Sequence, residues 1–319
     1  QGEEVPAETI FPEATEQPRG PEVRAAVEAL QKREQLLKTI QYTWLSTTTF
    51  RKELTGSRRN PRFEEVPKGQ QQKTSEKYSA YIDGSNYRLD KMRPDGGNPI
   101  KVSSQTATDE GGQLMWWQHK SATVTPPSRA PLVSTLLTNV EPFLVAYRFF
   151  DPKLGTVKPE QLKFLGQFEY AGHPCIAIEG PPVGGKGMYE RWYLAKDRDY
   201  CPVAYETLVP RDGREPELFK RVKLEYEKSG HPAWLLESWE LTVFDDGEVR
   251  YVNENRRVNA SYNEPIPDDT FRIDFPPGTE VEDKRKDTTD TVGKEEEDSS
   301  GGIKGDPALL KKVAEGWKA

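Results

Sequence analysis

Segments in which apolar and polar residues alternate with a period of two dominate this chain from Gln41 onward. In the segment 234–244, Trp239, Leu241 and Val243 share one side of an extended chain, as in a half-buried strand. Turn residues such as Asp83-Gly84 separate neighbouring segments, as in hairpins. We predict strands over Gln41–Leu54, Lys77–Ile82, Asn86–Arg93, Pro99–Thr106, Gln113–His119, Leu162–Tyr170, Pro174–Glu179, Met188–Ala195, Pro202–Val209, Leu218–Lys228, Trp234–Phe244 and Glu248–Ser261. The chain is therefore expected to form a large antiparallel sheet in which sequential strands are neighbours.

Two other stretches have helical spacing. Apolar residues recur every three or four positions from Pro21 to Ile40, and proline suits the first turn of a helix. Leu132 to Phe150 has similar spacing, interrupted at Pro142, and predicts one or two short helices. Each helix has an apolar face to bury, so the first is expected on the concave face of the sheet and the second as a plug. Strands on both sides of the plug favour a single, mainly β domain of the α+β class.

Composition restricts the kinds of partner. The formal net charge is -7, with Lys+Arg 45 against Asp+Glu 52, so no excess positive charge attracts nucleic acid. Mean hydropathy is -0.82, and no run approaches the roughly 18 apolar residues that indicate a transmembrane helix. Residues 1–20 are rich in proline and glutamate and are predicted to be a disordered tether. Because the chain opens at Gln1 rather than methionine, we favour an exported, processed protein over a cloning boundary.

The end of the chain is predicted to be a linker and a helix. Residues 285–305 are charged and of low complexity, which is typical of a disordered linker. In 306–319, apolar residues recur every four positions, at Leu309, Val313 and Trp317. This short amphipathic helix either docks on an envelope protein, a membrane surface or the chain's own groove, or packs loosely on its own domain.

No residue pattern points to catalysis, a metal or a cofactor. The histidines occur singly, without further ligands at metal-binding spacing, and no nucleophile or metalloprotease motif is present. We therefore predict a protein that is not an enzyme and has no cofactor. Cys175 and Cys201 lie in separate predicted strands, where they form either a disulfide or two unpaired buried thiols.

Tryptophans in the predicted strands are the strongest signal for a binding site. Trp44, Trp116, Trp117, Trp192 and Trp239 all lie in such segments, and the adjacent pair places one side chain on each face of a regular strand. Aromatic residues in strands commonly form a core. The alternative is that some of them line a partly empty apolar hollow between the sheet and the helices.

The stretch 263–283 is predicted to hold the last strand. Phe271, Ile273 and Phe275 alternate with charged residues, and flanking prolines exclude a long helix. We expect the folded domain, residues 21–284, to end with this strand.

This stretch, with three others, resembles the outer-membrane lipoprotein carrier-like superfamily, which includes periplasmic carriers, outer-membrane receptors and envelope-stress sensors. YNEPIPDDTFRIDFPPGTEVEDK is similar to its C-terminal signature, and NYRLDKM to its Phe-Arg-Trp strand, with Arg88 at the arginine. Residues 108–119 resemble its Asp-Gly hairpin, and 189–206 its paired strands joined by an aspartate turn. One departure is that Asp83-Gly84 stands where carriers have an Arg-Pro pair.

The resemblance implies a curved, unclosed antiparallel β-barrel around helices, with an apolar cavity and no catalytic residues. It implies a protein of the periplasm or cell envelope that binds an acyl chain, lipid or lipoprotein. The alternative is a protein-interaction or envelope-stress sensor module with a filled cavity. The predicted ligand-binding residues are Trp44, Tyr87, Leu89, Trp116, Trp117, Trp192, Trp239 and Leu241.

Overall fold

The computed structural model describes residues 20–57, 60–94, 99–126, 137–150, 158–182, 187–211, 213–228 and 230–293. Its α-helices are α1 (Pro21–Leu36) and α2 (Leu137–Tyr147). The strands are β1 (Thr39–Phe50), β2 (Lys52–Ser57), β3 (Asn60–Glu65), β4 (Lys73–Asp83), β5 (Asn86–Arg93), β6 (Ile100–Thr108), β7 (Gly111–Trp116), β8 (Ser121–Thr125), β9 (Lys163–Tyr170), β10 (His173–Glu179), β11 (Tyr189–Ala195), β12 (Cys201–Arg211), β13 (Arg214–Glu227), β14 (Leu235–Asp245), β15 (Glu248–Tyr262), β16 (Glu280–Asp283) and β17 (Thr288–Thr291).

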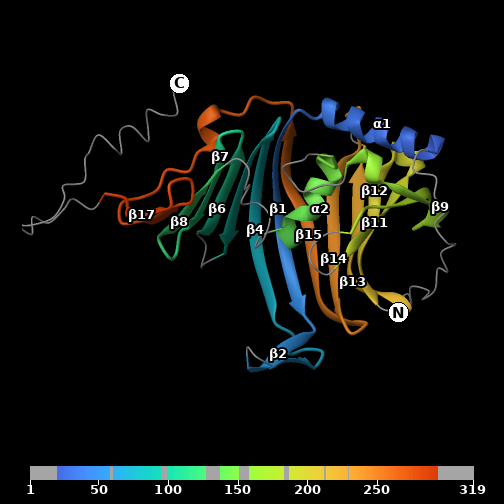
Figure 1. The fold of residues 1–319 in the computed structure, drawn as a ribbon, viewed down its shortest axis with the longest axis horizontal. Helices are drawn as coiled ribbons and strands as arrows, with labels where there is room; N and C mark the ends of the chain where they lie inside the picture. Colours follow the sequence, from blue (N-terminus) through green and yellow to red (C-terminus); the bar gives the residue numbers. More distant parts are fainter. Residues whose placement is uncertain are drawn as a thin grey trace, which may run out of the picture.

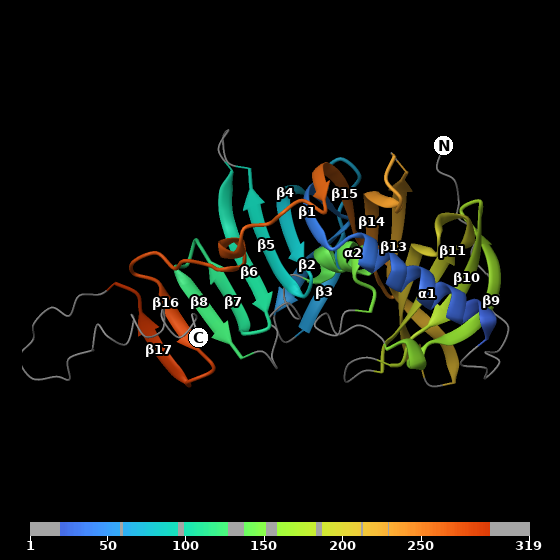
Figure 2. The same cartoon turned by 90° about the horizontal axis from the view of Figure 1, so that it is seen from above.

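One sheet of 15 strands organises the molecule, in the order β17-β16-β8-β7-β6-β5-β4-β1-β15-β14-β13-β12-β11-β10-β9. β1 lies near its middle and pairs with β4 on one side and β15 on the other. Neighbouring strands are antiparallel except for β16, which runs parallel to β8. β17 and β9 are separate edges, and the sheet bends around α1 and α2 (Figures 1 and 2). The predicted curved, unclosed antiparallel sheet with helices inside it is confirmed.

Most strands of the sheet lie close to the limits predicted from the alternation of apolar and polar residues. β5 has the predicted limits, Asn86–Arg93, and the strands from β9 to β15 lie within a few residues of the predictions. The sequence reading missed β8 and the hairpin of β2 and β3, because polar and basic residues hid their strand pattern. β8 is short but buries Ala122 and Val124, whereas β2 and β3 pair with each other as a separate hairpin.

The predicted last strand is wrong between Phe271 and Phe275. Residues 268–271 form a 3-10 helix, and 272–276 are extended but belong to no sheet. Phe271 and Ile273 are buried and the intervening Arg272 is exposed, so the alternation reports burial alone. Residues 268–276 cross the sheet as one segment, which we call the strap. Gln113 holds it by accepting a hydrogen bond from the Ile273 amide at 2.8 Å.

A terminal hairpin extends the fold beyond the predicted boundary at 284. β16 pairs with β17, and the Lys284 amide donates to the Val124 carbonyl at 2.9 Å. The Val292 amide donates to the Thr279 carbonyl, also at 2.9 Å. Residues 285–293, which we predicted to belong to the linker, therefore form part of the sheet structure.

α1 is anchored by its apolar stripe and by one buried cation. Pro21 takes its first position, and Val23, Ala26 and Leu30 are buried against the sheet. The helix ends at Leu36, four positions before the predicted Ile40, because β1 begins at Thr39. Arg33 lies between two tyrosine rings, with its guanidinium 5.3 Å from Tyr147 and 5.0 Å from Tyr226. Stacking on aromatic faces partly offsets the desolvation of this charge.

α2 is enclosed by the sheet and α1. Val140 and every residue from Pro142 to Tyr147 are buried, so the described part of this helix is apolar on nearly all sides. It contacts β12, β13 and β14. Arg148 follows α2 directly and connects it to the turn between α1 and β1. Its Nη2 donates to the carbonyls of Leu37 and Lys38 at 2.7 and 2.9 Å. The predicted helical plug is thus present, with Pro142 inside it.

Candidate binding site

The concave face holds an aromatic cluster centred on Trp44 of β1. The Trp44 ring stacks on Tyr78 of β4 at 5.1 Å between centroids, and on Phe143 of α2 at 5.6 Å. Trp239 of β14 lies 5.3 Å away in a tilted arrangement. Aromatic pairs at these separations stabilise a core beyond their buried area. α2 thus packs Phe143 on Trp44 near the middle of the sheet, where Tyr78 of β4 and Trp239 of β14 flank the Trp44 ring.

Six of the eight predicted ligand-binding residues belong to this core. Each is at most 3% exposed and packs in one cluster with α2, and the six are Trp44, Tyr87, Leu89, Trp192, Trp239 and Leu241. The structure therefore brings them together on one face of the sheet. Helix side chains occupy the space where the resemblance implied an apolar cavity.

The remaining two predicted residues, Trp116 and Trp117, lie apart from that cluster. Trp116 is the last residue of β7, opposite Ser103, and is partly exposed. Trp117 starts the following turn, and its indole Nε1 donates to Ser104 Oγ at 2.9 Å. The adjacent tryptophans therefore do not line one hollow with Trp44.

A polar cluster borders the apolar core where α2 meets the strands. Lys220 of β13 donates to both carboxylate oxygens of Glu141, the single charged residue of α2, at 2.7 and 2.6 Å. Glu190 of β11 is a second carboxylate, with an oxygen 3.7 Å from the Lys220 ammonium. Thr207 of β12 lies 3.5 Å from Glu190, and the Tyr205 ring centroid is 5.1 Å from Lys220. The buried Lys220 ammonium thus lies within 3.7 Å of two carboxylates, those of Glu141 and Glu190.

The pKa values of Glu190 and Lys220 are shifted by burial and by the neighbouring charges. Burial, followed by the nearby Glu141 charge, raises the pKa of Glu190 to about 8. Burial alone would lower the pKa of Lys220, but the charges of Glu141 and Glu190 outweigh it and raise that pKa. At neutral pH the cluster therefore holds a proton on Glu190 and an ion pair between Lys220 and Glu141.

Sequence reasoning missed this polar cluster, although a signal was present. Alternation places Lys220 on the same side of its strand as Val222, Leu224 and Tyr226, which are core residues. Glu190 likewise lies on the same side of β11 as the core residue Trp192. A charged residue in an inward-facing position is a recognisable exception to the pattern.

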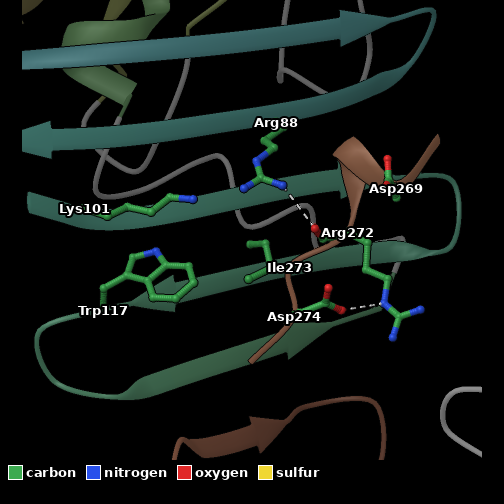
Figure 3. A pocket seen from close by; sticks show the side chains of 7 residues that line it. All are labelled: Arg88, Lys101, Trp117, Asp269, Arg272, Ile273 and Asp274. Carbon is green, nitrogen blue, oxygen red and sulfur yellow. Dashed lines mark hydrogen bonds and ion pairs between the residues drawn. The ribbon is translucent and has the colours of Figure 1, made fainter. Parts of the chain in front are cut away.

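An open groove of about 400 Å³ lies on the opposite face of the sheet, under the strap (Figure 3). Arg88 faces it because it alternates with the core residues Tyr87 and Leu89. The groove is lined by Arg88, Lys101, Trp117, Asp269, Arg272, Ile273 and Asp274.

Arg88 fastens the strap beside this groove. Its Nη1 donates to the carbonyls of Thr270 and Arg272 at 2.8 and 3.1 Å, and its Nε pairs with Asp90 at 3.0 Å. Lys101 lies 4.9 Å from the centroid of the Trp117 ring. Three cations, two carboxylates, one aromatic ring and one aliphatic side chain make this a surface suited to a polar peptide rather than to an acyl chain.

The disulfide alternative is wrong, and both cysteines are buried free thiols. Cys175 and Cys201 lie on β10 and β12, with β11 between them. Two strand spacings amount to about 10 Å, which exceeds the Cα separation of roughly 6 Å typical of a disulfide. Their side chains also belong to different hydrophobic clusters, on opposite faces of the sheet.

The predicted docking residues Leu309, Val313 and Trp317 lie outside the described residues, as do the tether 1–19 and residues 294–305 of the linker. Within the described part, neither helix has the length and apolar character needed to cross a membrane. His, Cys, Asp and Glu side chains in this part form no group of three that could hold a metal.

The fold is similar to those of solved proteins, one of them described as a LolA-superfamily protein. A solved domain described as an outer membrane lipoprotein-sorting protein from Vibrio parahaemolyticus has 12% identity and a TM-score of 0.50, covering 78% of this chain and 97% of its own. A LolA-superfamily protein from Nitrosomonas europaea has 9% identity and a TM-score of 0.51, covering 79% of this chain and 99% of its own. The sequence matches no protein-family model and no curated protein.

Proposed function

We propose that this chain is a non-catalytic binding protein of the cell envelope. It takes an acyl chain, a lipid or another apolar ligand between the sheet and the helices, and α2 occupies that place in the absence of ligand. The observation that carries the proposal is the position of α2, an apolar helix enclosed by the curved sheet at the side chains predicted to contact a ligand. The Vibrio domain's description names outer membrane lipoprotein sorting, which supports an envelope location here.

Displacement of α2 has a clear energetic requirement. The helix has 11 residues and is about 16 Å long, so a ligand must replace a long apolar surface. Burial of hydrocarbon contributes about 25 cal/mol per Å², which a long acyl chain supplies without directional contacts. Because Phe143 contacts Trp44 directly, a chain that replaces α2 would come to lie against Trp44 and Trp239.

Tryptophan quenching by a brominated fatty acid tests this proposal. Bromine quenches indole fluorescence on contact, so titration is expected to give saturable quenching of the wild-type protein. The double variant Trp44→Phe/Trp239→Phe is expected to lose most of the quenched signal. Trp117→Phe is the matched control, because Trp117 lies in the groove on the other face. No saturable quenching, or quenching lost only in Trp117→Phe, would refute binding at the concave face.

A second candidate is a protein-interaction or sensor module with a permanently filled concave face. The groove on the opposite face favours it, because Trp117, Lys101 and Arg88 combine an aromatic side chain with cations. A photoreactive residue in place of Lys101 is expected to crosslink to a partner protein in the native host. The same residue in place of Lys223, an exposed lysine of β13, serves as the control. Equal labelling from both positions would count against a partner at the groove.

A further inference from the structure

Glu141 gives α2 the chemical character of an anionic amphiphile. The sequence of α2, LTNVEPFLVAY, carries one formal charge, and its other described residues are apolar or aromatic and buried. The carboxylate is held by Lys220 at 2.6 Å. The helix therefore presents an apolar rod and one carboxylate to the sheet, and each has a complementary surface there.

Lys220 lies where an apolar site meets a charged one. It is 7% exposed, and it pairs across the sheet with Val243, a core residue. The groups around it come from four elements: Glu141 of α2, Glu190 of β11, Tyr205 and Thr207 of β12, and Tyr251 of β15. Among these, only Glu141 bonds to the ammonium with both oxygens, while Glu190 is 3.7 Å away.

We propose that Lys220 binds the carboxylate headgroup of a single-chain anionic amphiphile, and that Glu141 occupies this headgroup site while α2 fills the concave face. The inference rests on the proposed function and specifies its ligand class. A neutral apolar chain could replace the buried surface of α2, but it would leave Lys220 without the carboxylate that α2 provides. A fatty acid replaces both the buried apolar surface of α2 and the Glu141 carboxylate.

Charge balance supports this selectivity. With Glu190 protonated at neutral pH, Lys220 and Glu141 form a neutral pair. Exchange of Glu141 for a ligand carboxylate leaves that balance unchanged. Exchange for an uncharged ligand forces Glu190 to release its proton or leaves a buried cation unpaired, and an unpaired buried charge is unfavourable.

Calorimetric titration with dodecanoate and 1-dodecanol at neutral pH tests the proposal, since the two probes differ only at the headgroup. The wild-type protein is expected to bind dodecanoate about tenfold more tightly, the effect of one charge-assisted hydrogen bond. Glu141→Gln weakens the hold of the sheet on α2, so it is expected to strengthen the binding of both probes several-fold and to leave the preference for dodecanoate in place. Lys220→Met is expected to abolish the preference.

Two further variants keep the test interpretable. The double variant Glu141→Gln/Lys220→Met removes both charges together, so it avoids leaving carboxylates unpaired if Lys220→Met alone fails to fold. Lys223→Met is the matched control, because Lys223 is 46% exposed and faces away from α2. Circular dichroism establishes that each variant is folded.

The outcomes separate this inference from the proposed function. Equal binding of the two probes by the wild-type protein, or a preference that survives in the folded double variant, would overturn the headgroup site and leave apolar binding intact. Failure of both probes to bind would overturn the proposed function and this inference with it. A preference lost in Lys220→Met and kept in Lys223→Met supports the site.

Discussion

Trp44→Ala is expected to reduce the free energy of unfolding by about 3–5 kcal/mol. Trp44 is 0% exposed, and its ring contacts Tyr78, Phe143 and Trp239 from three different elements. Alanine would remove stacking on two sides and leave a cavity between α2 and the sheet. Urea denaturation monitored by far-UV circular dichroism measures the change.

Trp117→Ala is the matched control for that experiment. Trp117 is partly exposed, and its main polar contact is the hydrogen bond to Ser104. Its loss is expected to cost about 1–2 kcal/mol. If the two substitutions proved equally costly, Trp44 could not be the centre of the filled core, and α2 would have to pack less tightly than the structure shows.

Glu190→Gln is expected to change how stability depends on pH. The folded pKa of about 8 lies above the ordinary carboxyl value of 4.5, so between these values the folded protein holds a proton that the unfolded chain has lost. Raising the pH through this window therefore favours unfolding, by up to about 1.4 kcal/mol per pH unit. Glutamine cannot lose a proton, so the variant is expected to escape this loss.

Urea denaturation at about pH 5.5 and about pH 7.5 measures the free energy of unfolding of the variant and of the wild-type protein. The difference between them is expected to grow by about 2 kcal/mol in favour of the variant as the pH rises. Glu240→Gln is the control, because Glu240 is 43% exposed on β14. Parallel pH profiles for Glu190→Gln and the wild-type protein would contradict a proton held on Glu190 at neutral pH. The profile also reports on the same cluster as the proposed headgroup site, without any ligand.

Local patterns were enough to predict most of the strands. Alternation in β13 and β14 reflects burial of one face, and this depends only on which side of a strand each residue takes. The limits of β5 followed from the Asp83-Gly84 turn before it and its own alternating residues. In the strap, Phe271 and Ile273 alternate in burial with charged residues without any strand partner, so alternation indicates one buried side but not a strand.

The candidate site was predictable only in part. Six of the residues predicted to bind a ligand share one face of the sheet in the structure. Period-two alternation could not reveal that Phe143 of α2 packs on Trp44, because that depends on where a separate helix packs. Nor could it join Glu141 to Lys220, which are 79 positions apart in the chain.

By itself, the sequence determined the strand pattern, the two helices and the apolar character of one face of the sheet, because each depends on neighbouring residues. Only the tertiary structure decided that this face is filled by α2, that Lys220 holds the helix carboxylate, and that the two cysteines lie apart. These features depend on which distant elements pack together, and local alternation carries no information about that choice.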